Sequence, residues 1–261
     1  MNQDIIIANN LEQNLTDAIG KVEHDKLFVL TDTTTRELCW PVVQDYAAMK
    51  DACMITIPPT DEAKTMETLA DVWTALQKGG ATRHSLMVNL GGGMVTDLGG
   101  FAASTFKRGM AYINIPTTLL SQVDASVGGK TGINFGGLKN EIGVVNCARS
   151  VILSSTFLRT LDRENLLSGY AEMLKHGLLS SKENWAELLC FDISAPDYEV
   201  LQSMVAKSVA IKEQIVKEDP TEKGIRKALN LGHTAGHAIE SLALKEGRTV
   251  LHGYAVAWGL L

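Results

Sequence analysis

Three histidines and one glutamate have the residue types and the spacing of a catalytic metal site. His233 and His237 lie four residues apart, which puts both on one face of a helix. His252 follows just before another predicted helix, and Glu172 comes earlier in the chain. Two imidazoles and one carboxylate with an open coordination position are typical of catalytic zinc, although the H-E-x-x-H motif of metalloproteases is absent. Spacing leaves open which histidine binds metal and which transfers protons. The alternative is that these histidines bind no metal and are simply packed or exposed on helices, as is expected for His176.

A glycine turn at Gly91, Gly92 and Gly93 follows a predicted strand and precedes a predicted helix. Glycines let the backbone approach a phosphate, and the N-terminus of the next helix offers free N–H groups to it. The turn lacks the G-x-G-x-x-G fingerprint of dinucleotide-binding proteins, so a tight turn without a ligand is the alternative. Asp97 is expected in the first turn of the helix, where capping is a simple role for it.

Basic and polar residues gather in the segment after this turn. Thr117 and Thr118 follow a predicted strand, at the sheet end where ligands bind. The run from Ser126 to Gly132 lacks the spacing of a phosphate-binding P-loop. Several lysines among glycine-rich turns indicate an oxyanion site, although each alone could be a solvated surface charge. The group comprises Lys107, Arg108, Asp124, Lys130, Lys139 and Asn140.

The elements that must position these residues fall into two halves. Short apolar runs alternate with a helical pattern at 61–78, which predicts a parallel sheet covered on both faces. After residue 156 helix formers dominate, with long helices expected at 196–217 and 230–245. We therefore expect an α/β domain at 1–155 and an all-helical domain at 156–261, with the site in the cleft between them. The predicted strands are 26–31, 54–57, 85–90 and 112–115.

Composition excludes several classes of protein. The 261 residues are 45% apolar and 21% charged, as in ordinary globular proteins. The formal net charge of −6 does not suggest a nucleic-acid partner, so an anionic substrate needs a local basic cluster. Four scattered cysteines predict neither disulfides nor a thiolate zinc site, and favour a reducing cytoplasm. No signal peptide or membrane span is expected.

Several longer segments, taken in order, resemble the 3-dehydroquinate synthase family within the wider sugar-phosphate cyclases. They span most of residues 90–261 and are more specific than any single motif above. The segments are GGGMVTDLGGFAASTFKRG (91–109), PTTLLSQVDASVGGKTGIN (116–134), LKNEIG (138–143), SGYAEMLKHG (168–177), RKALNLGHTAGHAIE (226–240) and LHG (251–253).

The resemblance implies a Rossmann-like NAD-binding domain followed by a helical domain with a divalent metal, Zn²⁺ or Co²⁺. It assigns the metal to Glu172, His233 and His252, and proton chemistry to His237. Arg108 would reach the substrate phosphate, from the same subunit or from its neighbour. The matching substrate-pocket positions are Asp124, Lys130, Lys139, Asn140, Lys175, Lys212, Arg226 and Asn230. The matching cofactor positions are Asp32, Glu62, Gly92, Gly93, Asp97, Thr117, Thr118, Lys130, Lys139 and the turn from Phe157 to Thr160.

The activity implied by the resemblance is a lyase of the shikimate pathway, which serves aromatic amino acid biosynthesis. It converts 3-deoxy-D-arabino-heptulosonate 7-phosphate to 3-dehydroquinate and phosphate, in a cytoplasmic homodimer whose NAD is regenerated in each turnover. Arg226 suits the carboxylate of such a sugar acid. Three alternatives stay open: another sugar-phosphate cyclase, an iron-dependent polyol dehydrogenase, and a non-enzymatic nucleotide-binding module.

The chain departs from the family pattern in three places. The family usually has a Gly-Glu-x-x-Lys run where this chain has 60–65, with Lys64 placed one position early, which argues against Lys64 as an adenine-side contact. Tyr254 stands where a glutamate usually follows His-Gly, so a partner of His252 is expected to be lost or replaced. The chain also stops at Leu261 inside a predicted helix, where the family continues with further helices, so a truncated form is expected.

Overall fold

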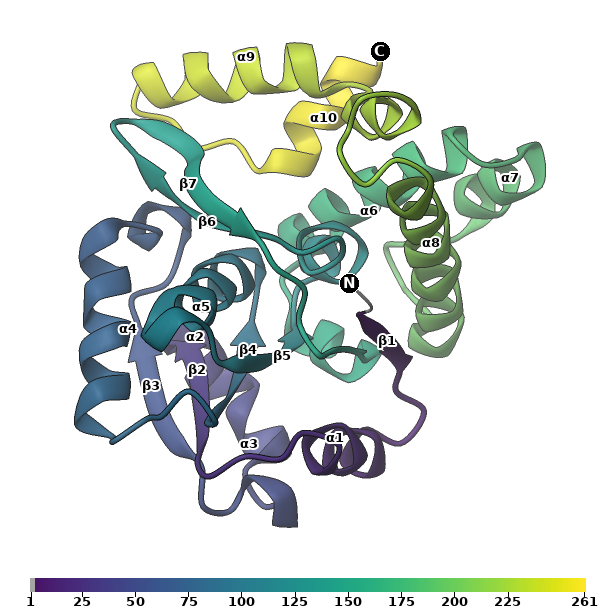
Figure 1. The fold of residues 1–261 in the computed structure, drawn as a ribbon. Helices are drawn as coiled ribbons and strands as arrows, with labels where there is room; N and C mark the ends of the chain where they lie inside the picture. Colours follow the sequence, from purple (N-terminus) through teal and green to yellow (C-terminus); the bar gives the residue numbers. More distant parts are fainter. Residues whose placement is uncertain (1–2) are drawn as a thin grey trace. The chain divides into compact units, whose positions relative to one another are not determined.

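The computed structural model describes residues 3–261, which form two compact units (Figure 1). The first contains the residues up to Thr117 together with Gly128–Phe157, and the second contains Thr118–Val127 together with Leu158–Leu261. The segment Thr118–Val127 thus packs with the helical unit, although it lies well before residue 155.

A six-stranded parallel sheet forms the centre of the first unit, in the order β1-β8-β5-β4-β2-β3. Every residue of β2 and β4 is buried, as expected for apolar strands covered on both faces. All four predicted strands are present, and the predicted fold class is confirmed. The strands are β1 (Asp4–Ile7), β2 (Leu27–Asp32), β3 (Cys53–Ile57), β4 (Leu86–Gly91), β5 (Ala111–Pro116) and β8 (Ser150–Leu153).

The strand order reverses direction between β2 and β4, because β3 lies on one side of β2 and the later strands lie on the other. In open parallel sheets, ligands bind outside the carboxyl ends of the strands at such a switch point. The predicted helix at 61–78 begins only at Met66, since the Thr65 hydroxyl caps it by accepting from the Thr68 N–H. The helices of this unit are α1 (Leu11–Gly20), α2 (Thr33–Leu38), α3 (Trp40–Val43), α4 (Met66–Lys78) and α5 (Gly93–Thr105).

An antiparallel hairpin of β6 (Lys130–Phe135) and β7 (Leu138–Val145) also belongs to the first unit. The expectation that Lys130, Lys139 and Asn140 lie near glycine-rich turns is confirmed, because Lys130 follows Gly128 and Gly129, and the other two follow the turn at Gly136 and Gly137. The three residues themselves lie in strands, where Asn140 has a φ of +54°. Side chains of β7 are mostly exposed, so the sequence shows no apolar alternation there.

The second unit is helical. The predicted helices at 196–217 and 230–245 are present, with shifted starts. Asp197 caps the first by accepting from two backbone N–H groups, and Gly232, with φ of +80°, precedes the second. A π-helical turn at Ser121–Ala125 joins this unit. Its helices are α6 (Arg163–Leu178), α7 (Lys182–Cys190), α8 (Tyr198–Glu218), α9 (His233–Lys245) and α10 (His252–Leu260).

Among the helices of residues 3–261, none combines the length and the apolar character that crossing a lipid bilayer requires.

Candidate functional site

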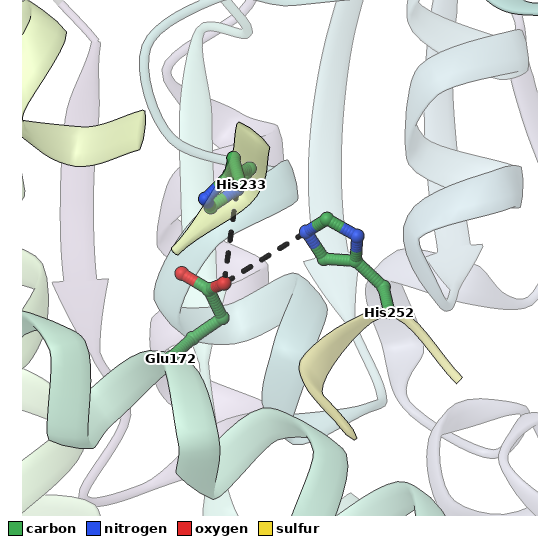
Figure 2. A group of neighbouring side chains, drawn as sticks. All are labelled: Glu172, His233 and His252. Carbon is green, nitrogen blue, oxygen red and sulfur yellow. Dashed lines mark ion pairs between the residues drawn. The ribbon is translucent and has the colours of Figure 1, made fainter. Parts of the chain in front are cut away.

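Glu172, His233 and His252 meet within the second unit, although they lie on three different helices (Figure 2). Glu172 lies in α6, while the two histidines are the first residues of α9 and α10. Oε1 of Glu172 lies 3.9 Å from Nε2 of His233 and 3.8 Å from Nε2 of His252. The structure thus brings together the three side chains that the resemblance assigns to a metal ion.

Two glycines next to the histidines make this approach possible. Gly232 takes a left-handed φ of +80° directly before His233, a conformation that favours glycine. A Cβ on Gly253, directly after His252, would lie 1.8 Å from the carbonyl oxygen of Ser168 on α6. The Gly253 N–H donates instead to the Ser168 hydroxyl at 3.0 Å. Backbone contact between α10 and α6 therefore holds one histidine over the glutamate.

The carboxylate of Glu172 is fully buried; Oε2 forms an ion pair, and Oε1 has no hydrogen-bond partner among the described residues. Its cationic neighbour is Lys175, one turn further along α6. Burial and the negative charge of Asp124 raise the pKa of Glu172, against the lowering effect of Lys175. Burying an ion costs several kcal/mol unless it is well paired. The environment of Oε1 therefore favours a further cation.

Both imidazoles present Nε2 to Glu172 and use Nδ1 elsewhere. Nδ1 of His233 lies 3.2 Å from the Leu231 carbonyl oxygen, and Nδ1 of His252 lies 3.4 Å from Oε2 of Glu240. An Nδ1–H that donates to oxygen leaves the Nε2 lone pair free for a metal ion. Burial lowers the pKa of His233 to about 4, so that ring is neutral at pH 7. The three donor atoms therefore suit a divalent cation.

His237 lies one turn beyond His233 on α9, with its side chain 60% exposed. Its Nδ1 lies 2.9 Å from Oε2 of Glu240, and its ring centroid lies 5.7 Å from that of His252. Glu240 was not singled out from the sequence, although it is three residues from His237 and therefore on the same helix face. A second group of potential metal ligands consists of these two histidines and Glu240.

An ion pair between a buried lysine and a partly buried aspartate joins the π-helical turn to α8 in the second unit. Nζ of Lys212 lies 2.6 Å from Oδ1 of Asp124 and 2.5 Å from the carbonyl oxygen of the same residue. Burial alone would raise the pKa of Asp124, but Lys212 and Lys175 outweigh it and hold that pKa well below its usual range. Asp124 is therefore ionised at neutral pH.

His176 is buried on α6, where its Nδ1 lies 2.7 Å from the Ser208 hydroxyl. Burial, reinforced by the charge of Lys175, lowers the pKa of His176 to about 3. This environment agrees with the expectation of a packed histidine, and it keeps the ring neutral at pH 7. His176 also lies near Asp124 and Glu172, as a third group of potential ligands.

Arg226 and Asn230 lie in the segment between α8 and α9. The Asp219 carboxylate shapes this segment by accepting from the backbone N–H of Gly224 and of Arg226. The buried Arg226 donates from Nη1 to the Pro220 carbonyl. Asn230 donates to Oε1 of Glu222, a residue that the sequence analysis missed and that no local motif marks. An open surface depression of about 510 Å³ is lined by Glu222, Lys227, Ala228, Asn230, Leu231 and Thr234.

A separate polar cluster lies in the first unit around Lys64. This buried lysine pairs with Asp97 at 2.5 Å and also hydrogen-bonds the Asn140 side chain. The capping role considered for Asp97 is wrong, because its carboxylate lies beyond the first turn of α5 and binds a lysine. Nζ of Lys139 lies 3.5 Å from Oδ2 of Asp61. The carboxylate paired with Lys139 thus comes from Asp61, whereas Glu62, which the resemblance assigns to the cofactor, is exposed.

The glycine turn and Asp32 lie at the switch point of the sheet. Asp32 ends β2 and caps α2 by accepting from the Thr35 N–H at 2.7 Å. Gly92 is the N-cap of α5 and has no side chain to bind the first N–H groups of that helix. The Thr117 N–H donates to the Gly91 carbonyl, which joins the ends of β5 and β4. The arrangement suits a dinucleotide with its phosphates at α5.

The remaining assigned residues lie in both units. In the first unit, Lys130 is exposed at the start of β6, and Arg108 is exposed with a φ of +69°. Phe157 is buried in the short 3-10 helix Ser155–Thr160. In the second unit, Thr118 hydrogen-bonds the Ser121 hydroxyl at 3.0 Å.

Comparison with known proteins places the chain in a family. Residues 54–168 match the family model described as 3-dehydroquinate synthase N-terminal, and residues 169–261 match the one described as 3-dehydroquinate synthase C-terminal. A 3-dehydroquinate synthase of Parabacteroides distasonis is 55% identical over 259 residues, which cover 99% of this chain and 73% of the relative.

Solved structures of two sugar-phosphate cyclases are also similar. A 2-deoxy-scyllo-inosose synthase complexed with carbaglucose-6-phosphate, NAD⁺ and Co²⁺ has 25% identity and a TM-score of 0.87, over 98% of this chain and 71% of that one. The 2-epi-5-epi-valiolone synthase of Streptomyces hygroscopicus, with NAD⁺ and Zn²⁺ bound, has 30% identity and a TM-score of 0.84, over 100% and 73%.

Dehydrogenases and reductases with 12–16% identity share the fold alone. The relative with 55% identity and the two family models together cover almost the whole chain. The chain belongs to the 3-dehydroquinate synthase family.

Proposed function

We propose that this chain is a lyase that converts 3-deoxy-D-arabino-heptulosonate 7-phosphate to 3-dehydroquinate and inorganic phosphate, with catalytic NAD and one divalent cation. The observation that carries the proposal is the buried carboxylate of Glu172, whose Oε1 lacks a hydrogen-bond partner among the described residues and faces two imidazole Nε2 atoms. Family membership supplies the reaction, and this geometry supports its metal-dependent chemistry.

We assign the cation to Glu172, His233 and His252. Tetrahedral zinc takes two histidine nitrogens and a carboxylate at about 2.0–2.2 Å each, which keeps a fourth position open for substrate. The ligand atoms lie within 4.8 Å of one another, so a modest contraction suffices. When bound, the cation would supply a Lewis acid that polarises substrate oxygens, and NAD would supply a hydride acceptor. The similar solved cyclases carry Co²⁺ or Zn²⁺.

We assign NAD to the carboxyl ends of β2 and β4. The N-terminus of α5, where Gly92 leaves N–H groups free of side chains, suits the pyrophosphate. Asp32 at the end of β2 stands where an acidic residue can accept a hydrogen bond from a ribose hydroxyl. The two similar solved cyclases contain NAD⁺, which supports this assignment.

The substrate is anionic at two places, its carboxylate and its phosphate. Within the second unit, Lys175, Lys212 and Arg226 provide buried cations against the net negative charge of the chain. A guanidinium binds a carboxylate with two parallel hydrogen bonds, so Arg226 suits a sugar acid better than a neutral sugar. We assign the phosphate to the exposed Arg108, which is in the first unit.

We assign proton transfer to His237. Its Nδ1 is held by Glu240, while its side chain stays 60% exposed and thus accessible to a ligand or water. A ring that is oriented through one nitrogen can exchange a proton through the other. We further propose a homodimer, as the resemblance implies, for which light scattering should give twice the 28.2 kDa of one chain.

Product analysis tests the proposed substrate. The purified chain, supplied with NAD and Zn²⁺, should convert the heptulosonate phosphate to 3-dehydroquinate, identified by NMR and mass spectrometry. Sedoheptulose 7-phosphate, which has the same number of carbons but no carboxylate, is the matched control and should give no cyclic product. Turnover of the control alone would assign the chain to another kind of sugar-phosphate cyclase.

A further inference from the structure

One carboxylate oxygen of Glu240 faces two of the functional histidines. Oε2 lies 2.9 Å from Nδ1 of His237 on the same helix and 3.4 Å from Nδ1 of His252 on α10. Glu240 is only 9% exposed, so water competes little for this oxygen. The carboxylate is therefore placed to fix the orientation of both rings.

Tyr254, two positions after His252, does not supply a partner for the His252 ring. Tyr254 packs its ring edge-on against Trp258, with centroids 6.4 Å apart on α10. The carboxylate near His252 Nδ1 comes instead from α9. The replacement expected for the missing glutamate at position 254 is thus supplied by a residue that lies 12 positions before His252.

A neutral imidazole carries its single proton on one of two nitrogens. If Nδ1 of His252 holds it and donates to Glu240, the Nε2 lone pair stays free and points toward Glu172. Without an acceptor near Nδ1, the proton can move to Nε2 and block metal binding. The same oxygen orients His237, so the two rings are kept 5.7 Å apart by a shared partner.

We propose that Glu240 is a positioning residue that holds His252 in the tautomer able to bind metal and, with the same oxygen, orients His237. The inference rests on the metal site assigned under the proposed function. It adds Glu240, which acts on that site through both histidines. Carboxylates that accept from ligating histidines typically change metal affinity 10–100-fold when they are removed.

The test compares Glu240→Gln with Glu246→Gln. Glu246 follows the same helix but is exposed and pairs with Arg248, so its variant controls for the loss of one charge. Zinc affinity of the metal-free proteins is measured by competition with a chromogenic chelator. We expect the dissociation constant to rise roughly 10–100-fold for Glu240→Gln and to stay at the wild-type value for Glu246→Gln.

A second readout needs neither metal nor turnover. In the metal-free wild type, ¹⁵N chemical shifts at alkaline pH should show the proton of His252 on Nδ1. Glu240→Gln should move it toward Nε2, because the amide NH₂ can donate to Nδ1 whereas the carboxylate only accepts. Circular dichroism checks folding. If Glu240→Gln does not fold, Glu240→Asp takes its place, because its shorter side chain keeps the charge but draws the oxygen away from the rings.

The outcomes separate the two proposals. Equal zinc affinity in wild type and Glu240→Gln, with an unchanged tautomer, overturns the role of Glu240 and leaves the metal site intact. A wild type that binds no divalent metal overturns the proposed metal site together with the role of Glu240 in it.

Discussion

Removing the ammonium of Lys212 should weaken the second unit by more than removing any exposed charge. Its Nζ makes short contacts with the side chain and the backbone carbonyl of Asp124, and the two side chains are 9% and 27% exposed. Breaking a buried ion pair by deleting one partner costs about 3–5 kcal/mol. Because Asp124 is partly exposed and Lys175 also lowers its pKa, we expect Lys212→Met to lower the free energy of unfolding by roughly 2–3 kcal/mol.

The same helix contains a matched control. Lys207 pairs with Glu187 at 2.7 Å, but these side chains are 52% and 41% exposed. Exposed pairs contribute about 0–1 kcal/mol, so Lys207→Met should change little. Hydrogen exchange of the amides in α8, measured by mass spectrometry on metal-free protein, reports the stability of this unit separately. The most protected amides should exchange roughly 30–150-fold faster in Lys212→Met than in wild type.

The difference in stability between wild type and Lys212→Met should depend on pH, because the pKa of Asp124 is lowered in the folded protein. A carboxyl whose pKa is lowered by folding stabilises the protein at pH values above its unfolded pKa, which is about 3.9. That stabilisation is lost as the pH falls toward the folded value. The difference between wild type and Lys212→Met should therefore be equal at pH 7 and pH 5.5 and shrink below about pH 4. Equal exchange in Lys212→Met and Lys207→Met would refute the reasoning.

Three further tests use single substitutions. Arg226→Lys should cost roughly 2–4 kcal/mol of transition-state binding, measured as a lower kcat/KM, because an ammonium cannot bind a carboxylate bidentately. A loss of kcat/KM under about tenfold contradicts the assignment. His237→Ala should keep its metal and lose rate, whereas His233→Ala should lose the metal; elemental analysis showing equal loss would reverse the roles. Gly253→Ala should lower the melting temperature, since its Cβ would meet a backbone carbonyl at 1.8 Å, whereas Gly20→Ala, with open space around it, should not.

The sequence alone predicted the central strands because their apolar runs are continuous. β2 and β4 are buried at every residue, and their polar side chains are few: Thr31 and Asp32 at the end of β2, and Asn89 in β4. The β6–β7 hairpin was missed because β7 is mostly exposed and both strands contain glycine. The edge strand β1 has only four residues, too few for periodicity to mark it.

The family resemblance predicted the candidate site residue by residue. The residue types and their spacing alone predicted only a set of possible metal ligands. The partners of those residues depend on packing that local sequence does not contain. Glu240 meets His252 only because α10 packs on α9, and Lys64 meets Asp97 across 33 positions of the chain. The association of Thr118–Val127 with the helical unit is likewise a tertiary property.

The most direct test of the proposed function is the balance between phosphate and NADH in one reaction. A cyclase returns the hydride within each turnover, so its NAD is catalytic, whereas a polyol dehydrogenase accumulates NADH. With NAD far below the concentration of 3-deoxy-D-arabino-heptulosonate 7-phosphate, we expect phosphate release to equal substrate consumed. NADH absorbance should stay below the enzyme concentration. Steady growth of NADH without phosphate release would contradict the cyclase function and favour a dehydrogenase.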